Sequence, residues 1–552
     1  MAEGTAGTGG MPTVFLRNAT GLVKAWSAYD AFIYSFMSVN LVTLGLYGMS
    51  FGYSIPDGQL LAAVLFTGVA VTFLVVVYAA LIAAIPRAGG DYTWQSRILG
   101  GGIAFVLAVT GWWFILWHWT PIYANILVVQ FISPLLATIG QSGAAAWFAT
   151  PTGVFVSCLI TLAFVGAVVT VGMEMYARIQ KVCFYGGLVG LAVLILVLLF
   201  STQSDFHAAF NREAASLFGV QGDAYQQTID AAQKGGFDAQ PFGFFAAGPS
   251  LLLVPFVVFN LLWPNWGATL YGEVRGAKEY WRPFTSMFAG LWVTVVLTAI
   301  LLVLTAKTMG WEFYNSANAA YWNSFYAVQG APTPDAGHFL PIWPYPVLLA
   351  SWLIPNHAIQ FVIVAVMGLW FFGWAGTLFL SSTRVIFAAA FDRVLPSWAA
   401  NISASRRVPY GALLLMVVPS IVVSAIYAYR PGFSTYTLDA TLVIAVTYLG
   451  TIIAATILPW RRRDIFASSP IAQYRIGGVP VITIAGLLTS AFLIYNLVKW
   501  GTDAVYGVNN AGSAVYMLAM YVLAVVIYVV ARIVRGRQGI DLARIHAEIP
   551  VD

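Results

Sequence analysis

The residues that could do chemistry in this sequence interrupt otherwise apolar segments. In FNLLWPNWGATLYGEVRG (259–276), Asn260, Pro264 and Asn265 break a hydrophobic run. Pro264 cannot donate to a helical ladder but is tolerated as the first residue of a new helix, so two half-helices are predicted to meet near Asn260 to Asn265. Such a break presents carbonyls from one half and amides from the other, which suits a zwitterion. The alternative is a proline kink packed against neighbouring helices.

A second segment, YDAFIYSFMSVNLVTLGLYG (29–48), carries uncharged polar residues at its centre. Ser35, Ser38, Asn40 and Thr43 offer hydroxyls and an amide without formal charge. These two segments are the first and the sixth of the apolar segments. Interruptions five spans apart are expected where two inverted halves build one site at the membrane midplane. The alternative is hydrogen bonding between packed helices.

The composition indicates which elements position these residues. The chain has 552 residues, of which 60% are hydrophobic and 9% charged, far from the roughly 25% charged composition of soluble domains. Windows of about 20 apolar residues, enough to cross a bilayer core, recur along it. We therefore predict an all-α polytopic membrane protein with twelve transmembrane helices. The predicted spans are 26–50, 59–85, 101–134, 152–172, 182–200, 247–272, 286–308, 359–382, 410–428, 438–460, 479–498 and 513–532.

The positive charges predict the orientation. An even number of spans places both termini on one side of the membrane, and most Lys and Arg residues fall on that side. Because Lys and Arg are enriched in cytoplasmic loops, both termini are predicted to be cytoplasmic, in the plasma membrane, with the N-terminus retained. The net charge of +5 is explained by these anchors, so no nucleic acid partner is expected. The five exceptions are Arg212, Lys234, Lys307, Arg430 and Lys499.

Few ionisable residues lie inside the predicted spans. His118 in span three can titrate during proton coupling, or it can be a neutral packing residue. Asp30 and Glu273, near span ends, can form gate salt bridges with Lys24, Arg275 or Lys278, although solvated end charges fit each of them better. Six aromatic residues can line a substrate pocket or simply pack the bundle. They are Trp113, Trp117, Tyr123, Trp263, Trp266 and Trp370.

Enzyme and metal chemistry find little support. The five His and two Cys residues are scattered without metal-ligand spacing, so no cofactor and no firm metal site are predicted. GMSFG (48–52) matches a nucleophile-elbow pattern, but it ends a membrane helix instead of joining a strand to a helix. We therefore expect no catalytic residue and no enzyme activity.

Three junctions resemble those of a known family. IPRAGGDYTWQSRILGGG (85–102) has its Pro, Gly-Gly-x-Tyr and Arg-x-Leu-Gly signature, and GEVRGAKEYWRP (272–283) has its Gly-Glu-x-Lys/Arg run. SSTRVIFAAAFDRVLPSW (381–398) is similar to its Arg-Val-x-x-Ala, acidic residue and Leu-Pro sequence. The chain resembles amino acid–polyamine–organocation (APC) permeases over essentially its whole length.

The resemblance implies a LeuT-like fold in which spans 1–5 and 6–10 are inverted repeats and spans one and six are discontinuous. It implies substrate between the two breaks, where amides of Ser38, Val39, Asn40, Leu41 and Thr43 hold a carboxylate and carbonyls of Phe259, Asn260 and Leu262 hold an ammonium group. The implied segments are 1–25 (cytosolic), 26–200 (first repeat), 201–246 (extracellular loop), 247–460 (second repeat, with an outer gate loop at 309–358), 461–532 (spans eleven and twelve after a basic loop) and 533–552 (cytosolic tail).

The sequence departs from the family pattern at both breaks. The first break lacks the usual glycines, so Ser38 and Asn40 are expected to contribute side-chain bonds. In the sixth span, Trp263, Pro264 and Asn265 stand where an aromatic residue, a glycine and an acid are common. The span-five lysine that replaces a coupling sodium in some relatives has no counterpart.

The sequence does not determine the coupling ion or the oligomeric state. Thr377 and Ser381, four residues apart on one helical face, can supply hydroxyls to a sodium site between spans one and eight, or they can bond their own helix. The sequence predicts a secondary active permease for amino acids or related small amines that works by alternating access. The coupling ion is H⁺ or Na⁺, in a symporter, or the protein is an exchanger (antiporter). The alternative is a transporter-fold receptor or assembly subunit that binds a ligand without transport.

Overall fold

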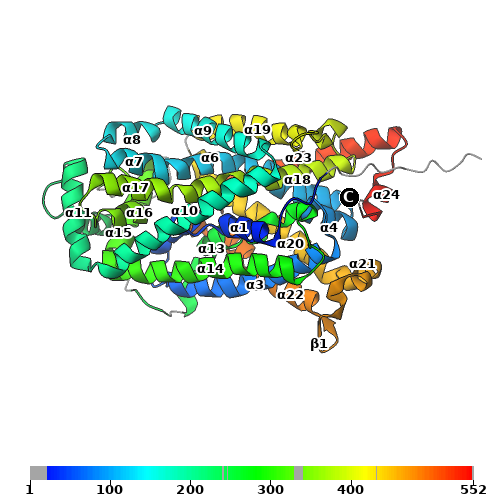
Figure 1. Cartoon of the computed structure of the whole chain (residues 1–552), viewed down its shortest axis with the longest axis horizontal. Helices are drawn as coiled ribbons and strands as arrows, with labels where there is room; N and C mark the ends of the chain where they lie inside the picture. The colour runs from blue at the N-terminus through cyan, green and yellow to red at the C-terminus, as the bar shows by residue number, and fades with distance from the viewer. Residues whose placement is uncertain (1–21, 239–241, 245–246, 329–339, 431, 550–552) are drawn as a thin grey trace, which may run out of the picture.

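The structure is a computed structural model of the whole chain, and it describes residues 22–238, 242–244, 247–328, 340–430 and 432–549. Among these residues, twelve helical segments are long and apolar enough to cross a membrane, which confirms the predicted number. Figure 1 shows the long helices lying roughly along one axis as a bundle.

The spans are built from one to five consecutive helical elements each. They comprise α1 (Ala28–Val39), η1 (Leu41–Gly45) and α2 (Leu46–Met49); α3 (Leu60–Ala84); α5 (Gly101–Ala104), η3 (Phe105–Phe114), α6 (Leu116–Leu127), η4 (Val128–Ile132) and α7 (Ser133–Thr138); α9 (Pro151–Thr170); α10 (Met173–Phe200); α13 (Ala247–Leu261) and η5 (Trp266–Glu273); α14 (Trp281–Thr305), η6 (Ala306–Gly310) and α15 (Trp311–Val328); α17 (His357–Met367) and α18 (Leu369–Phe391); α19 (Tyr410–Tyr429); η8 (Phe433–Tyr436) and α20 (Thr437–Arg461); α22 (Val481–Thr502); and α23 (Ala511–Arg537).

Shorter elements lie between the spans and after the last one. They are η2 (Gly52–Ser54), α4 (Gly90–Ile98), α8 (Ser142–Phe148), α11 (Gln203–Phe218), α12 (Ala224–Lys234), α16 (Pro346–Ser351), η7 (Ser397–Ala400), α21 (Arg463–Ser468), η9 (Pro470–Gln473), the antiparallel pair β1 (Arg475–Ile476) and β2 (Val479–Pro480), η10 (Ala504–Tyr506) and α24 (Leu542–Ala547).

The two ends of the bundle differ in what they carry. One end, which we call the terminal face, holds α4, α21, β1 and α24, on the right in Figure 1. The opposite end holds α11, α15 and α16. Helix α12 packs on α11 and α15, and we call these four helices the cap. Span one lies deepest, with 94% of its apolar window buried inside the protein, whereas only 6% of the window of α23 is buried. Span twelve is therefore peripheral.

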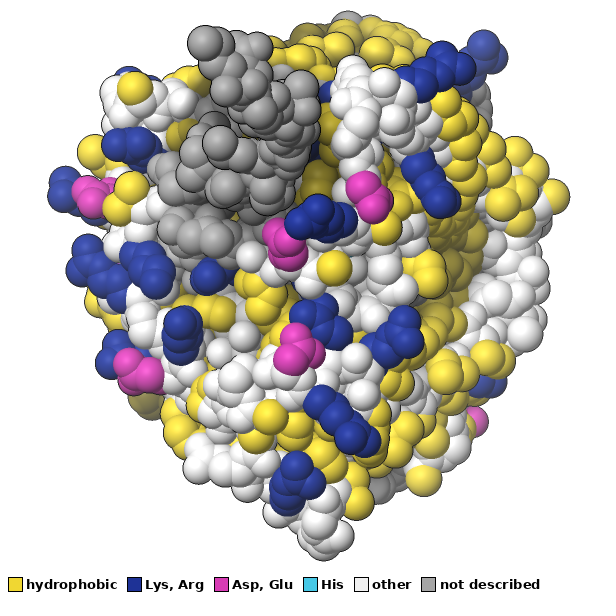
Figure 2. All heavy atoms as spheres, turned by 90° about the vertical axis from the view of Figure 1, so that its right-hand side faces the viewer, with side chains coloured by type: hydrophobic (Ala, Val, Ile, Leu, Met, Phe, Trp, Pro, Cys, Tyr) yellow, Lys and Arg dark blue, Asp and Glu magenta, His cyan; other side chains and the backbone are white. Residues whose placement is uncertain are grey.

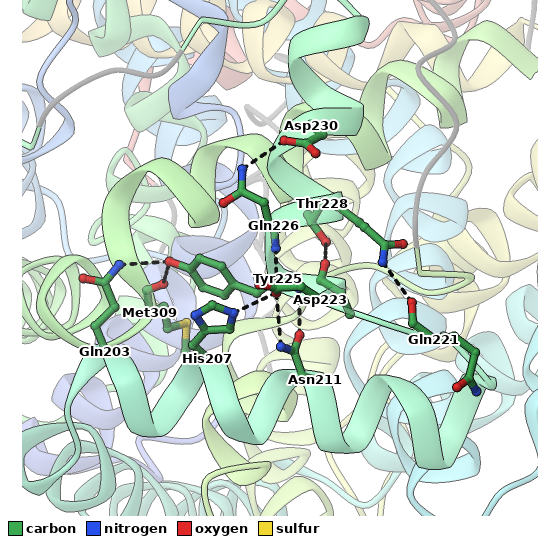
Figure 3. Close-up of polar contacts among 12 residues, drawn as sticks. Gln203, His207, Asn211, Gln221, Asp223, Tyr225, Gln226, Thr228, Asp230 and Met309 are labelled. Atoms are coloured by element: carbon green, nitrogen blue, oxygen red, sulfur yellow. Dashed lines mark hydrogen bonds and ion pairs between the residues drawn. The ribbon is translucent and has the colours of Figure 1, made fainter.

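The cap is built from two long connections that fold back on the bundle. His207 and Asn211 of α11 contact the carboxylate of Asp223, which caps α12 (Figure 3). The hydroxyl of Tyr225 donates to the carbonyl of Met309 at 3.0 Å, and its ring stacks on Phe313 of α15 at 4.4 Å. The described parts of both connections are thus packed helical structures. Of the predicted segments, residues 1–21, 239–241, 245–246, 329–339, 431 and 550–552 lie outside the described residues.

Several helices extend beyond their apolar windows. Span eight continues from the predicted end at 382 to Phe391, and span five begins at Met173 instead of 182. Arg384 lies inside the extension of span eight and pairs with the buried Glu273. Hydropathy underestimates such helices, because a charge that is paired inside the protein does not require the helix to end.

Candidate functional site

Span one is interrupted at Asn40. Helix α1 ends at Val39, and Asn40 adopts the left-handed conformation with φ of 42°. Asn is one of the few residues other than Gly that tolerate this conformation. Its Oδ1 accepts from the amide of Thr43 at 2.8 Å and its Nδ2 donates to the carbonyl of Trp370 at 2.9 Å. Asn40 therefore adopts the left-handed backbone conformation that glycine adopts most readily, and both the oxygen and the nitrogen of its side-chain amide are hydrogen-bonded.

The neighbours of Asn40 face different surroundings. The hydroxyl of Ser38 donates to the carbonyl of Tyr34 in its own helix at 2.7 Å. The side chains of Val39 and Leu41 are fully buried. The hydroxyl of Thr43 is buried and has no hydrogen-bond partner within the described residues. Of the predicted first-break residues, Thr43 is the one that leaves a polar side-chain atom unpaired.

Span six is interrupted between Leu261, where α13 ends, and Trp266, where η5 begins. Pro264 has no N–H, so the carbonyl of Asn260 loses its helical donor. The carbonyl of Phe259, by contrast, accepts from the indole of Trp263 at 2.6 Å. The helix restarts as a short 3₁₀ segment two residues after Pro264, because Pro264 and Asn265 form a turn.

The two breaks lie against each other. Ser35 of α1 donates to the carbonyl of Pro264 at 2.8 Å. On the other side of the break, a Cβ added to Gly45 would lie 3.0 Å from Nδ2 of Asn260. The glycine at 45 thus allows the close approach of η1 to α13. The predicted juxtaposition of the first and sixth spans is present in the structure.

Aromatic rings surround the sixth-span break. The ring of Trp119 lies 5.9 Å from Phe259, 5.3 Å from Trp263 and 6.0 Å from Trp266. Tyr448 of α20 lies 6.3 Å from Trp263. These five rings, which we call the aromatic box, come from spans three, six and ten.

Several buried polar groups at the box and the breaks have no hydrogen-bond partner of standard geometry among the described residues. Buried polar groups in folded proteins are normally paired, so such a concentration points to a ligand. The unpaired groups are Thr43 Oγ1, Trp119 Nε1, Asn260 Oδ1, both amide atoms of Asn265, and the hydroxyl of Tyr448. All of them are uncharged. Leu262, which is fully buried, belongs to their apolar surroundings.

Other aromatic candidates point away from the breaks. The indoles of Trp113 and Trp117 donate to the carbonyl of Leu415 in α19. The indole of Trp370 donates to the carbonyl of Gly187 in α10. Sequence reasoning missed Trp119, which lies in α6 two residues after Trp117 and therefore on the opposite face of the helix.

His118 lies in a different neighbourhood from the breaks. Its ring packs against Tyr427, Phe433 and Tyr516 at 5.0 to 6.0 Å. Both ring nitrogens are buried without a hydrogen-bond partner within the described residues. The structure thus places His118 beside spans nine, ten and twelve.

The predicted sodium ligands fit a cation poorly as they are arranged. The hydroxyl of Thr377 donates to Trp374 in its own helix, and that of Ser381 donates to the carbonyl of Trp266 at 2.9 Å. The phenol of Tyr34 contacts Ser381 Oγ at 2.7 Å and donates to the carbonyl of Thr377 at 2.8 Å. Tyr34 therefore engages the oxygens that a cation between spans one and eight would need.

Two ion pairs lie between the breaks and the terminal face. Arg384 of α18 reaches both carboxylate oxygens of Glu273, at 2.8 and 3.2 Å, and the two side chains are 0% and 1% exposed. Glu273 is thus not the solvated end charge that its position suggested. Asp30, by contrast, caps α1 through Ser27 and pairs with the partly exposed Lys181 at 2.6 Å.

The three junction motifs meet each other at this face. Arg97 of the first motif forms a two-pronged ion pair with Asp392 of the third, and Arg384 of the third pairs with Glu273 of the second. The amide of Gly89 donates to the carbonyl of Thr269 at 2.9 Å. The chain entering span one joins them, since Trp26 forms a parallel bridge with Val274. These contacts tie the inner halves of spans one and six to span eight and to the junction between spans two and three.

A buried carboxylate that sequence reasoning did not single out lies beside these contacts. Asp91 of α4 is fully buried and accepts from Tyr78 at 2.5 Å, Thr451 at 2.6 Å and Trp112 at 3.1 Å. It forms no ion pair in the described part of the chain. The ring of Trp112 lies 4.5 Å from Trp266, so Asp91 is one residue removed from the sixth-span break.

Asp91 is expected to make stability depend on pH. Burial raises the pKa of its carboxyl from 3.8 to about 6, although the hydrogen bonds from Thr451 and Tyr78 oppose this shift. The folded state then binds the proton more tightly than the unfolded state, so this stabilisation is complete below pH 3.8 and is lost as pH rises through 6. Asp91→Asn should remove up to about 3 kcal/mol of this dependence. Thermal unfolding of both proteins between pH 4 and 7 measures it, and parallel curves would contradict the prediction.

Comparison with known proteins identifies the family of the chain. The sequence model of the family described as amino acid permease matches residues 30–259 and 344–531, which include the first break and most of α13 as well as spans eight to twelve. A comparison with curated proteins gives no match. The protein is thus a multi-pass membrane protein and an amino acid transporter in general terms, and the chain belongs to the amino acid permease family of the APC superfamily.

Proposed function

We propose that this protein is a secondary active permease that moves zwitterionic amino acids or related small amines through the site between the two breaks. The observation that carries the proposal is the set of unpaired, uncharged polar groups around Asn260 and Asn265 inside the aromatic box. In the described residues, no charged side chain belongs to this set. A neutral site suits a zwitterion better than a polycation, which needs opposed carboxylates.

The proposed binding mode uses both breaks. Because Pro264 has no N–H, the carbonyl of Asn260 lacks its helical donor and accepts from the ammonium group of the substrate. The side-chain amide of Asn265 and the hydroxyl of Thr43 donate to the substrate carboxylate. The ring of Trp119, next to Phe259 and Trp263, covers the apolar part of the substrate. Phe259 contributes its ring instead of its carbonyl, which Trp263 already engages.

Alternating access and orientation complete the proposal. Spans 1–5 and 6–10 act as inverted repeats, and rocking of one bundle against the other opens the site to each side in turn. The terminal face is the cytoplasmic one, in the plasma membrane, because Lys and Arg side chains gather on it and outnumber acidic ones (Figure 2). The ion pair between Arg384 and Glu273 must then separate or move as a unit when the cytoplasmic side opens.

Coupling to protons, coupling to sodium and exchange are three versions of this proposal. The buried carboxylate of Asp91, which forms no ion pair in the described part of the chain, supports protons, since it contacts Trp112, which packs on the sixth-span break. The engagement of Ser381 by Tyr34 and Trp266 gives sodium less support.

The test is transport by the purified protein in liposomes. Uptake of labelled neutral amino acids is measured with a proton gradient, with a sodium gradient, and with unlabelled amino acid inside the vesicles. We expect saturable uptake that an excess of unlabelled substrate suppresses, and Asn265→Ala liposomes serve as the matched control. Saturable binding without flux in all three settings would overturn the permease proposal and favour a receptor.

A further inference from the structure

The terminal face contains a basic pocket that the transport site does not use. It has a volume of about 840 Å³ and lies where α4, the start of span three, the ends of α20 and α23, and α24 meet. Figure 2 shows this face, with many basic and few acidic side chains. We call it the arginine pocket, after the four arginines in its lining: Arg97, Arg461, Arg462 and Arg532.

Two of the four arginines are already engaged. Arg97 pairs with Asp392, and Arg462 pairs with Asp464 at 2.8 Å and donates to the carbonyl of Arg97 at 2.8 Å. The other two, Arg461 and Arg532, form no hydrogen bond or ion pair in the described part of the chain. They come from different spans, ten and twelve, and line the same cavity.

Little negative charge compensates these two arginines. Among the residues that line the pocket, Asp541 is the one carboxylate, and its Oδ1 accepts from the amide of Ala543 as the cap of α24. His546 lies on the wall, beside Tyr92 at 3.1 Å. The pocket therefore has an excess of positive charge, which suits an anion with several acceptor oxygens.

Glycines give the pocket its room. A Cβ added at Gly100, Gly536 or Gly539 would meet no atom within 4 Å, so these positions border open space. At Gly101, in contrast, a Cβ would lie 2.0 Å from the ring of His546. The tail helix is thus seated directly on the start of span three, next to the open part of the pocket.

Exposed apolar residues lie next to the residues that line the pocket. Arg532 belongs to α23, the least buried span, on which Val529, Val530 and Ile533 are about half exposed. Ile103, at the start of span three, is 54% exposed. Acyl chains can therefore cover this apolar surface while a charged headgroup occupies the pocket, an arrangement that a soluble phosphate does not need.

We propose that the arginine pocket binds the phosphate group of an anionic phospholipid from the leaflet at the terminal face. Arg461 and Arg532 bind the phosphate oxygens, and the acyl chains lie along α23. Because Arg97 and Arg462 in the same wall donate to the carbonyls of Glu548 and Ala547, at 3.1 and 3.5 Å, an occupied pocket also holds the tail against the junction motifs. This inference does not rest on transport.

The test compares lipids with the same acyl chains and different headgroups. The full-length protein in neutral detergent is titrated with phosphatidylglycerol or with phosphatidylcholine, and bound lipid and the unfolding temperature are recorded by native mass spectrometry and tryptophan fluorescence. We expect phosphatidylglycerol to bind and to raise the unfolding temperature more than phosphatidylcholine. Arg461→Gln/Arg532→Gln should bind it roughly tenfold or more weakly, since each arginine near a phosphate contributes substantially.

The matched control removes two charges next to the pocket instead of within it. Arg463 and Arg537 are exposed, form no hydrogen bond or ion pair in the described part of the chain, and do not line the pocket. Arg463→Gln/Arg537→Gln should keep the wild-type affinity. An equal loss in the control would overturn the pocket in favour of diffuse surface charge. An equal stabilisation by glycerol phosphate or inorganic phosphate would overturn the lipid in favour of a soluble anion.

Discussion

Replacing Arg384 by Met is expected to lower the free energy of unfolding by roughly 3–5 kcal/mol and to abolish transport. The substitution leaves the carboxylate of Glu273 buried, 1% exposed, without the guanidinium that contacts both of its oxygens. An isolated buried charge costs far more than the pair contributes, because desolvation is no longer offset. Denaturant unfolding in mild detergent and liposome uptake measure the two effects.

The position of the pair explains why transport should fail together with stability. The main chain of Glu273 accepts from the amide of Trp26 at 3.1 Å, and the amide of Arg275 donates to the carbonyl of Trp26 at 2.9 Å. A displaced Glu273 therefore disturbs the contact between the inner parts of spans one and six. Loss of this contact should leave the terminal side of the site poorly closed.

Two control variants separate this explanation from a general effect of losing an arginine. Arg282 pairs with Glu279 at 2.7 Å on the surface, with exposures of 50% and 61%, so Arg282→Met should cost less than about 1 kcal/mol. The double substitution Arg384→Met/Glu273→Met should recover much of the stability, because no charge is then left unpaired. If Arg384→Met lowered the free energy of unfolding no more than Arg282→Met does, the buried ion pair between Arg384 and Glu273 would not stabilise the fold as expected.

Replacing Asn265 by Ala is expected to reduce transport at least about tenfold while changing the free energy of unfolding by less than about 1 kcal/mol. Both amide atoms of Asn265 are buried without a hydrogen bond of standard geometry in the described residues, and its polar contact with the hydroxyl of Tyr448 is a weak one, so little native bonding is lost. Removal of an unpaired buried polar group can even be neutral. The loss in transport follows from the proposed contact between this amide and the substrate.

Asn40 provides the matched comparison, because Asn40→Ala is the same chemical change at the other break. Here the amide bonds the Thr43 amide and the Trp370 carbonyl, and the backbone has φ of 42°. Asn40→Ala should therefore lower stability by roughly 2–3 kcal/mol as well as transport, and Asn40→Gly should recover the part that is due to backbone strain. Uptake and thermal unfolding of the three variants in parallel would show it. Equal losses of stability at Asn265 and Asn40 would mean that Asn265 is structural.

The sequence by itself determined the spans and the places where they break. Twelve apolar windows are visible because the bilayer sets their length, and Pro264 marks the sixth-span break because it lacks an N–H wherever it lies. The interruption at Asn40 could also be inferred from the sequence, because a buried polar side chain at the centre of an apolar span is costly unless it is hydrogen-bonded. These inferences depend only on local chemistry and on the solvent.

The tertiary structure decided which residues face each other. Glu273 has Arg275 and Lys278 close by in sequence, yet it pairs with Arg384 across 111 positions, because helix packing places α18 against η5. Asp91 looks like a loop charge in GGDYTW, and it becomes a buried carboxylate because α3, η3 and α20 converge on it. Trp117 and Trp119 lie on opposite faces of α6, and the packing of span three against α19 on one side and span six on the other decides that Trp119 is the one beside the break. Partners and faces are set by contacts between distant segments, and a linear pattern of residue types carries no record of those contacts.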